Sequence, residues 1–125
     1  MSKLLLVCAG GAIGSGARYL VGSWAVAAVG PGFPWGTLAV NLAGSFLISA
    51  VMYLGLEVGT VGPDLRIFLA VGVLGGFTTY SSFNHETLAL AQRGQWGLAS
   101  AYVAATLLGA WVAGLLLAQF ASSGS

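Results

Sequence analysis

Long apolar stretches, separated by short segments with glycine, proline or charged residues, dominate the hydrophobic pattern of this 125-residue chain. A helix needs about 20 mostly apolar residues to cross the hydrocarbon core of a bilayer, so the pattern predicts membrane-spanning helices. The predicted spans cover about residues 4–29, 36–56, 65–92 and 97–120. The expected fold class is therefore an all-α membrane protein, with residues 1–125 forming a single four-helix transmembrane domain.

A polar stripe runs along the second predicted span. Its members are Thr37, Asn41, Ser45 and Ser49, each four residues after the last. This spacing places them on one slowly drifting face of a helix. Single small polar residues often serve only as hydrogen bonds between helices, but a continuous stripe favours a polar pathway. Asn41 is its strongest member, because an amide can donate to an anion and accept from a neighbour at once.

The third predicted span contains an unusual segment, residues 75–84, in which a glycine pair is followed by hydroxyl and aromatic side chains. Main-chain groups without hydrogen bonds are costly in hydrocarbon, so such a segment is tolerated only inside the protein or beside a wet cavity. The span 65–92 is also longer than a straight crossing needs. We therefore expect a broken third helix with a binding site at the break.

The first predicted span combines small residues with a charge. Gly10 and Gly14 form a GxxxG pattern, which lets a neighbouring helix approach closely. Arg18 follows in the same span, where an arginine at the helix centre costs about 2.5–3.5 kcal/mol. Two interpretations remain open: Arg18 snorkels or pins a helix, or it attracts an anion into a vestibule.

The composition supports a membrane protein and excludes several functions. Charged residues make up 6% of the chain and hydrophobic residues 58%, and the mean hydropathy is +0.93. The formal net charge of +1, without a basic run, gives no electrostatic footprint for nucleic acid. A single cysteine, Cys8, excludes an intramolecular disulfide, and with the single histidine, His85, it leaves no cluster for structural zinc.

Catalytic chemistry has little support. Ser81 or Ser82 with His85 and Glu86 is the only nearby set, but it lacks HExxH spacing and a third group to orient the histidine. We therefore expect no enzymatic activity. Glu86 is the only carboxylate well inside a predicted span. It could couple transport to protons, or it could pair with backbone donors, a basic side chain or a half-helix N-terminus.

The charges near the span ends give almost no orientation signal. Lys3 and Arg66 fall on one side of the membrane and Arg93 on the other, so the positive-inside bias is nearly absent. A chain that inserts in both directions can form an antiparallel homodimer. Such a dimer would bring two copies of the central break together at a two-fold axis.

The segments GGFTTYSSF (75–83) and WGTLAVNL (35–42), together with Arg18, resemble the CrcB/Fluc family of fluoride channels. The resemblance spans nearly the whole chain, and both segments occur in the right spans and order. It implies a fluoride-selective channel of the plasma (inner) membrane that passively exports fluoride and so lowers cytoplasmic fluoride. It also implies a dual-topology, antiparallel homodimer with two pores and a central, structural sodium ion (Na+).

The resemblance assigns roles to individual residues. Backbone carbonyls at Gly75 and Thr78 match the sodium ligands. The residues matched to the fluoride pathway are Asn41, Tyr80, Phe83, Tyr102, Thr106, Ser82 and Arg18. Aromatic ring edges carry partial positive charge, which suits an anion contact. Two departures stand out: Tyr80 replaces the family's common phenylalanine, and Ala110 cannot extend the hydroxyl track of span four.

Two other functions compete with a fluoride channel. A small dual-topology, proton-coupled multidrug or cation exporter has a similar length, but it would carry a glutamate in span one. This chain has Arg18 there and no carboxylate. A small membrane assembly protein would explain the GxxxG face but not the polar stripe of span two.

Overall fold

The computed structural model describes residues 2–123, including their side chains except at positions 57 and 120–123. Positions 1, 124 and 125 of the predicted domain 1–125 lie outside the described residues. Within residues 2–123, four helical segments are long and apolar enough to cross a membrane. They are Ser2–Val29, Trp35–Leu56, Pro63–Gln92 and Trp96–Gln119. The expected all-α arrangement with four spans is therefore confirmed.

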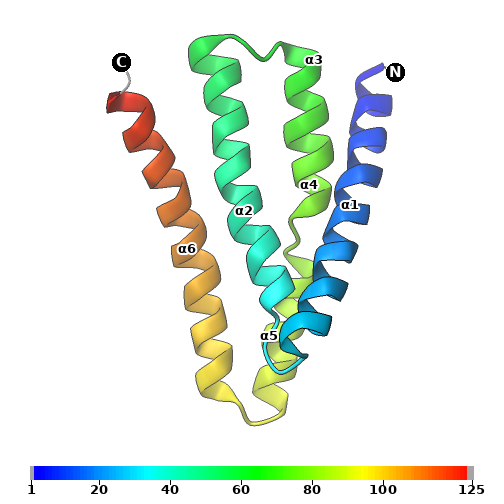
Figure 1. Ribbon diagram of the computed structural model, residues 1–125, viewed down its shortest axis with the longest axis vertical. Coiled ribbons are helices and arrows are strands. Elements are labelled where there is room, and N and C mark those ends of the chain that lie inside the picture. Colours follow the sequence, from blue (N-terminus) through cyan, green and yellow to red (C-terminus); the bar gives the residue numbers. More distant parts are fainter. Residues whose placement is uncertain (1, 124–125) are drawn as a thin grey trace.

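The chain crosses the molecule up and down, and the crossings diverge toward one end (Figure 1). The elements are α1 (Ser2–Val29), α2 (Trp35–Met52), the π-helix η1 (Tyr53–Val58), α3 (Pro63–Arg66), the π-helix η2 (Ile67–Leu74), α4 (Gly75–Phe77), α5 (Ser81–Gln92) and α6 (Trp96–Ser123). The α1–α2 and α5–α6 turns lie at one end. The start of α1, the η1–α3 connection and the end of α6 lie at the other.

Glycines in a left-handed conformation form the predicted turns between the spans. Gly30 follows α1 with φ of 84°, and Gly94 follows α5 with φ of 79°. Glycine adopts this region without the steric cost that a Cβ atom brings, so helices often end at such a residue. At the α5 end, the N–H of Gln95 donates to the carbonyl of Leu90, which satisfies part of the last helical turn.

The third crossing is assembled from several helical pieces. α4 ends at Phe77, Thr78 is extended with φ of −83° and ψ of 160°, and α5 begins at Ser81. We call residues 78–80 the linker. Because Thr78 is extended, the helical hydrogen-bond ladder does not pass through the linker. The main-chain groups around it need other partners.

Glycines allow α1 to contact the main chain of η2 and α4. A Cβ atom at Gly10 would lie 2.6 Å from the carbonyl oxygen of Phe68, and one at Gly14 would overlap the carbonyl oxygen of Val73. From the other side, a Cβ atom at Gly76 would lie 2.8 Å from the carbonyl oxygen of Gly11. The close approach predicted from the GxxxG pattern is thus confirmed. It brings α1 beside the linker.

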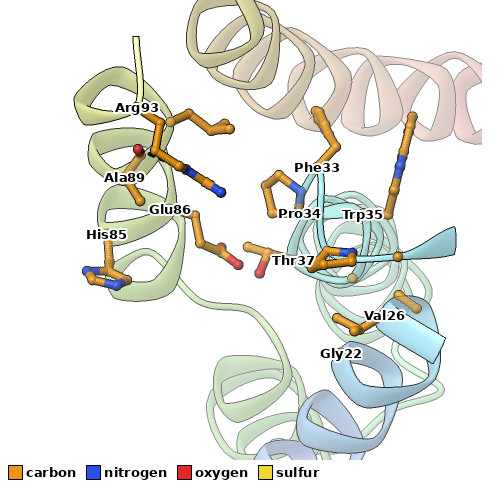
Figure 2. Close-up of a pocket in the computed structure, with 15 residues that line it drawn as sticks. Gly22, Val26, Phe33, Pro34, Trp35, Thr37, His85, Glu86, Ala89 and Arg93 are labelled. Carbon is orange, nitrogen blue, oxygen red and sulfur yellow. Dashed lines mark hydrogen bonds between the residues drawn. The ribbon is translucent and has the colours of Figure 1, made fainter. Parts of the chain in front are cut away.

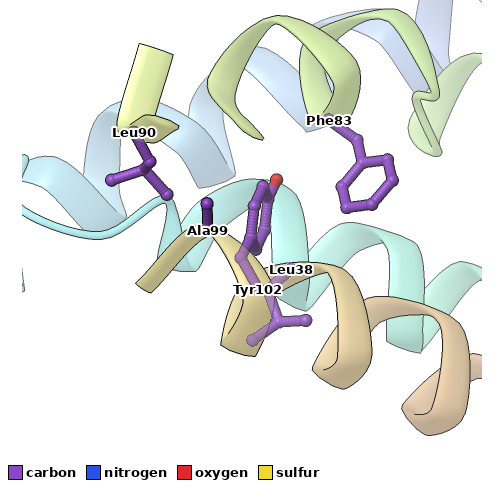
Figure 3. Packing of buried hydrophobic residues seen from close by; sticks show 5 residues of the cluster. All are labelled: Leu38, Phe83, Leu90, Ala99 and Tyr102. Carbon is purple, nitrogen blue, oxygen red and sulfur yellow. The ribbon is translucent and has the colours of Figure 1, made fainter. Parts of the chain in front are cut away.

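The buried hydrophobic cluster lies where α2, α5 and α6 meet (Figure 3). Its members are Leu38, Phe83, Leu90, Ala99 and Tyr102. Many large apolar side chains lie outside it and are exposed, among them Trp24 on α1 and Trp111 on α6. So much exposed apolar surface is unfavourable in water, whereas the lipid chains of a bilayer would cover it.

The α1 packing makes a testable prediction. Alanine at Gly14 should destabilise the folded protein by about 2 kcal/mol or more relative to alanine at Gly16, because overpacking against rigid main chain cannot be relieved by a rotamer change. Gly16 is a matched control, since a Cβ atom there would meet no atom within 4 Å and both changes raise helix propensity alike. Unfolding free energies in detergent micelles measure the difference. Equal stability of the two variants would contradict the packing described.

Candidate functional site

Asn41 of α2 makes two hydrogen bonds to the main chain of the linker. Its Nδ2 donates to the carbonyl oxygen of Thr79 at 3.0 Å, and the N–H of Thr79 donates to its Oδ1 at 2.8 Å. Asn41 is buried. A carboxamide offers the same donor and acceptor as a peptide group, so Asn41 satisfies both main-chain groups of one residue.

Other side chains satisfy the main chain on either side of Thr79. Arg18 of α1 donates from Nε to the carbonyl oxygen of Gly76 at 3.2 Å. The N–H of Ser82 donates to Oγ1 of Thr79 at 3.2 Å, and Oγ1 of Thr78 donates to the carbonyl oxygen of Leu74 at 3.0 Å. Groups from α1, from α2 and from the linker's own hydroxyls therefore bind main-chain groups of the linker and of the residues beside it.

A groove of about 490 Å³ lies beside the linker, between α2, the third crossing and α6. We call it the central groove. Its lining residues are Asn41, Gly44, Ser45, Ile48, Leu74, Gly75, Thr78, Thr79, Tyr80, Phe83, Thr106, Leu107 and Ala110. These residues are uncharged, and hydroxyl and amide groups alternate with apolar side chains. A groove of this kind can hold a small polar species without a fixed counter-charge.

Thr106 of α6 lines the central groove and carries a buried hydroxyl. Its side chain is 6% exposed, and its Oγ1 has no hydrogen-bond partner among the described residues. A buried hydroxyl without a partner costs about 1–3 kcal/mol, so most are paired. A residue of a groove wall that carries an unpaired buried hydroxyl is a candidate for ligand binding.

Aromatic rings form a continuous series from the central groove toward the α1–α2 turn. The ring centroids of Tyr80 and Phe83 lie 5.9 Å apart, and those of Phe83 and Tyr102 lie 5.0 Å apart, both edge to face. Tyr102 also meets Phe33 edge to face at 5.3 Å. The Tyr102 hydroxyl donates to Oε1 of Glu86 at 3.1 Å. The edge of an aromatic ring carries partial positive charge, so an anion can contact those edges that do not pack against a neighbouring ring.

A smaller cavity of about 280 Å³ opens at the end of the molecule that carries the α1–α2 turn. We call it the end cavity. Glu86 points from α5 toward Thr37 of α2 across it, and Arg93 lines it as well (Figure 2). Glu86 and Thr37 also line a neighbouring cavity of about 560 Å³, together with Arg18. Charged groups of both signs thus gather at this end.

Comparison with known proteins decides the family. A family model described as "CrcB-like protein, Camphor Resistance (CrcB)" matches residues 5–118. The chain belongs to the CrcB-like family. It is therefore a multi-pass membrane protein.

Curated relatives of this CrcB-like chain are named "Fluoride-specific ion channel FluC". The one from Anaeromyxobacter sp. (strain K) is 60% identical over 113 residues, which cover 90% of each chain. The one from Thermus thermophilus is 52% identical over 118 residues, covering 94% of this chain and 89% of the relative. The one from Agrobacterium fabrum is 48% identical over 122 residues, covering 95% and 98%. The likeness extends over nearly the full length of each, so the family is one of ion channels and not of enzymes.

The structure brings together some of the sequence-predicted site residues of this CrcB-like chain. Those that line the central groove are Asn41, Gly75, Thr78, Tyr80, Phe83 and Thr106. Ala110 also lines it, and as an alanine it offers no hydroxyl there, as expected. The polar stripe of α2 passes along successive cavities, with Thr37 in the end cavity, Ser45 in the central groove and Ser49 in a separate cavity beyond it.

Other predicted residues lie elsewhere. Ser82 and Tyr102 do not line the central groove: the N–H of Ser82 is bonded to Thr79, and Tyr102 is bonded to Glu86. Arg18 lines the cavity next to the end cavity. Its hydrogen bond to the carbonyl oxygen of Gly76 joins α1 to α4, which is the contact that the helix-pinning interpretation describes. The Glu86 partner is a phenol, which is neither a basic side chain nor a backbone donor.

Sequence reasoning missed the role of Thr79 as the residue that Asn41 holds. The irregular composition of residues 75–84 marked the linker, but nothing local indicates which side chain on another helix reaches it. Thr37 lies one turn before Asn41 on the same face of α2 and lines the same two cavities as Glu86.

Proposed function

We propose that this CrcB-like protein is a fluoride-selective channel through which fluoride leaves the cell passively across the plasma (inner) membrane. The observation that carries the proposal is the buried, unpaired hydroxyl of Thr106, a residue that lines the uncharged central groove together with Tyr80 and Phe83. The names of the curated relatives, which the chain matches over most of its length, support the same ion.

The chemistry of the groove suits a small anion. Fluoride is strongly hydrated, so a pathway must replace its water with hydrogen-bond donors and positive ring edges. Thr106 offers a donor that no protein group uses, and Tyr80 and Phe83 offer ring edges. Because no lysine or arginine lines the central groove among the described residues, the anion meets no charge that would trap it.

The approach to the groove carries charge. Arg18 and Arg93 lie at the cavities near the α1–α2 turn, where they can attract an anion, and Glu86 lines both cavities. Tyr102 holds Glu86 by a hydrogen bond and packs on Phe83, so it connects this end to the groove wall. The exporter alternative has less support, because α1 carries no carboxylate.

Replacement of Thr106 by valine tests the proposal. Valine keeps the shape and removes the hydroxyl, so loss of one charge-assisted hydrogen bond of about 1.5–3 kcal/mol should slow fluoride efflux roughly 10- to 100-fold. Because the hydroxyl is unpaired in the protein, stability should stay equal or rise. Fluoride and chloride electrodes on proteoliposomes measure the rates, and the unmodified protein should release fluoride far faster than chloride.

Thr87→Val is the matched control. The Thr87 hydroxyl donates to the carbonyl oxygen of Phe83 in its own helix at 2.8 Å and does not line the groove, so this variant should keep the fluoride rate. Equal rates for Thr106→Val and the unmodified protein would remove Thr106 from the pathway. Equal fluoride and chloride rates in the unmodified protein would refute the proposed function.

The working unit that we propose is an antiparallel homodimer with a sodium ion between the two third crossings. Tyr80 is 76% exposed, and Val71 and Gly75 on the same crossing are also exposed, so part of the groove wall lacks cover from its own chain. A second copy in the opposite orientation would cover it.

The linker main chain fits the proposed sodium ligands. In a continuous helix, the Gly75 carbonyl would accept from the N–H of Thr79, and the Thr78 carbonyl from the N–H of Ser82. Here these two N–H groups donate to Asn41 and to Oγ1 of Thr79. The carbonyls of Gly75 and Thr78 are thus left without those partners, and carbonyl oxygens are hard ligands that suit Na+.

One labelling experiment tests this assembly. In a Cys8→Ser background, single cysteines at Thr60 or Gln95, which lie in connections at opposite ends, should each react with an impermeant thiol reagent in about half of the copies in intact cells. Labelling at only one of the two positions would exclude the antiparallel dimer.

Sodium binding has a separate test. The purified dimer should melt at a lower temperature when a large organic cation replaces sodium. A melting temperature that does not depend on sodium would exclude the ion.

A further inference from the structure

The hydrogen bonds of Thr79 are the basis of this inference. Thr78 is extended, so Thr79 cannot continue the helical ladder of α4. In hydrocarbon, an N–H and a C=O without partners would disfavour this conformation strongly. A partner for both groups is therefore a condition for the linker to keep its shape.

Asn41 is the side chain that meets this condition. The carboxamide lies beside Thr79 with one bond of 3.0 Å and one of 2.8 Å, in opposite directions. The two groups exchange their bonds as two residues of an antiparallel sheet do. Because α2 is a regular helix here and Asn41 is 9% exposed, the amide has a fixed position.

We propose that Asn41 is a positioning residue, which acts on the anion route through the main chain of Thr79 and not as a ligand of the anion. The inference rests on the proposed function of the central groove. Thr79 is followed by Tyr80, and Oγ1 of Thr79 accepts from the N–H of Ser82 at the start of α5. By fixing Thr79, Asn41 therefore fixes the point from which Tyr80 and Phe83 enter the groove wall.

The donors of the central groove support this division of roles. Asn41 uses one side-chain N–H and its Oδ1 for hydrogen bonds to Thr79, whereas the Thr106 hydroxyl has no partner among the described residues. The amide retains one further N–H, and the alternative role for Asn41 is that of an anion ligand through this group. The two roles differ in what happens to the Thr79 amide when the side chain is removed.

Amide hydrogen exchange combined with fluoride efflux tests the proposal. Protein in lipid nanodiscs should show a protected Thr79 amide. In Asn41→Ala, exchange at Thr79 should accelerate by about tenfold or more, while the Leu42 amide in the same helix stays protected. Fluoride efflux of Asn41→Ala should fall by about tenfold or more in parallel. Ser45→Ala, the next member of the α2 stripe, has no bond to the linker and should leave Thr79 protected.

A second comparison uses the main chain itself. Thr79→Pro removes the N–H that Asn41 accepts, and the extended Thr78 is compatible with a following proline. Thr79→Ala keeps the N–H and controls for the lost hydroxyl. Asn41→Ala should lower efflux by about tenfold in the Thr79→Ala background and clearly less in the Thr79→Pro background. Equal factors in both backgrounds would overturn the inference.

The outcomes separate this inference from the proposed function. Reduced efflux with an unchanged Thr79 amide would show that Asn41 acts on the anion directly, and lost protection with unchanged efflux would show that the pairing does not serve the route. Either result overturns the inference. If Thr79→Pro does not fold, the exchange measurement on Asn41→Ala decides alone. If the unmodified protein passes no fluoride, the proposed function fails, and the Thr79 amide still reports whether Asn41 holds it.

Discussion

The main-chain N–H and C=O of Thr79, in the linker, have no helical partners, and a bilayer offers no water to replace them. This constraint explains why groups from two other helices converge on one short segment. Arg18 reaches Gly76 from α1, and Asn41 reaches Thr79 from α2. The glycines of α1 bring that helix against η2 and α4, so that Arg18 can make its contact. Packing, capping and the polar site thus depend on one another.

The same arrangement prepares an anion pathway without placing a charge in it. The side chains of Asn41 and Thr79 accept hydrogen bonds from the N–H groups of Thr79 and Ser82. Thr106, which lines the central groove, has a hydroxyl without a partner among the described residues. The rings of Tyr80 and Phe83 line this groove, and Tyr102 packs edge to face on Phe83 behind them. The charges of Glu86, Arg18 and Arg93 lie instead at the end cavity and at the cavity next to it. Attraction at the entrance and uncharged contacts inside suit a selective anion channel.

Much of this fold follows from local sequence, because span length, turn glycines and the GxxxG pattern are properties of neighbouring residues. The α2 stripe likewise predicted which helix face meets the cavities, and Asn41 and Thr106 were recognised as polar site residues. The partners could not be predicted. The bond of Asn41 to Thr79 and that of Tyr102 to Glu86 join residues 38 and 16 positions apart, and their geometry depends on how whole helices pack. Ser82 was assigned to the fluoride pathway, but it does not line the central groove.

Ion current across a planar bilayer gives the most direct test of the central claim, that the groove conducts fluoride passively. The reversal potential is measured with a fluoride gradient, first at equal pH on both sides and then with a pH gradient. The account predicts that the current reverses at the fluoride equilibrium potential in both conditions, because no proton accompanies the ion. A reversal potential that moves with the pH gradient, or that follows a chloride gradient instead, would contradict it.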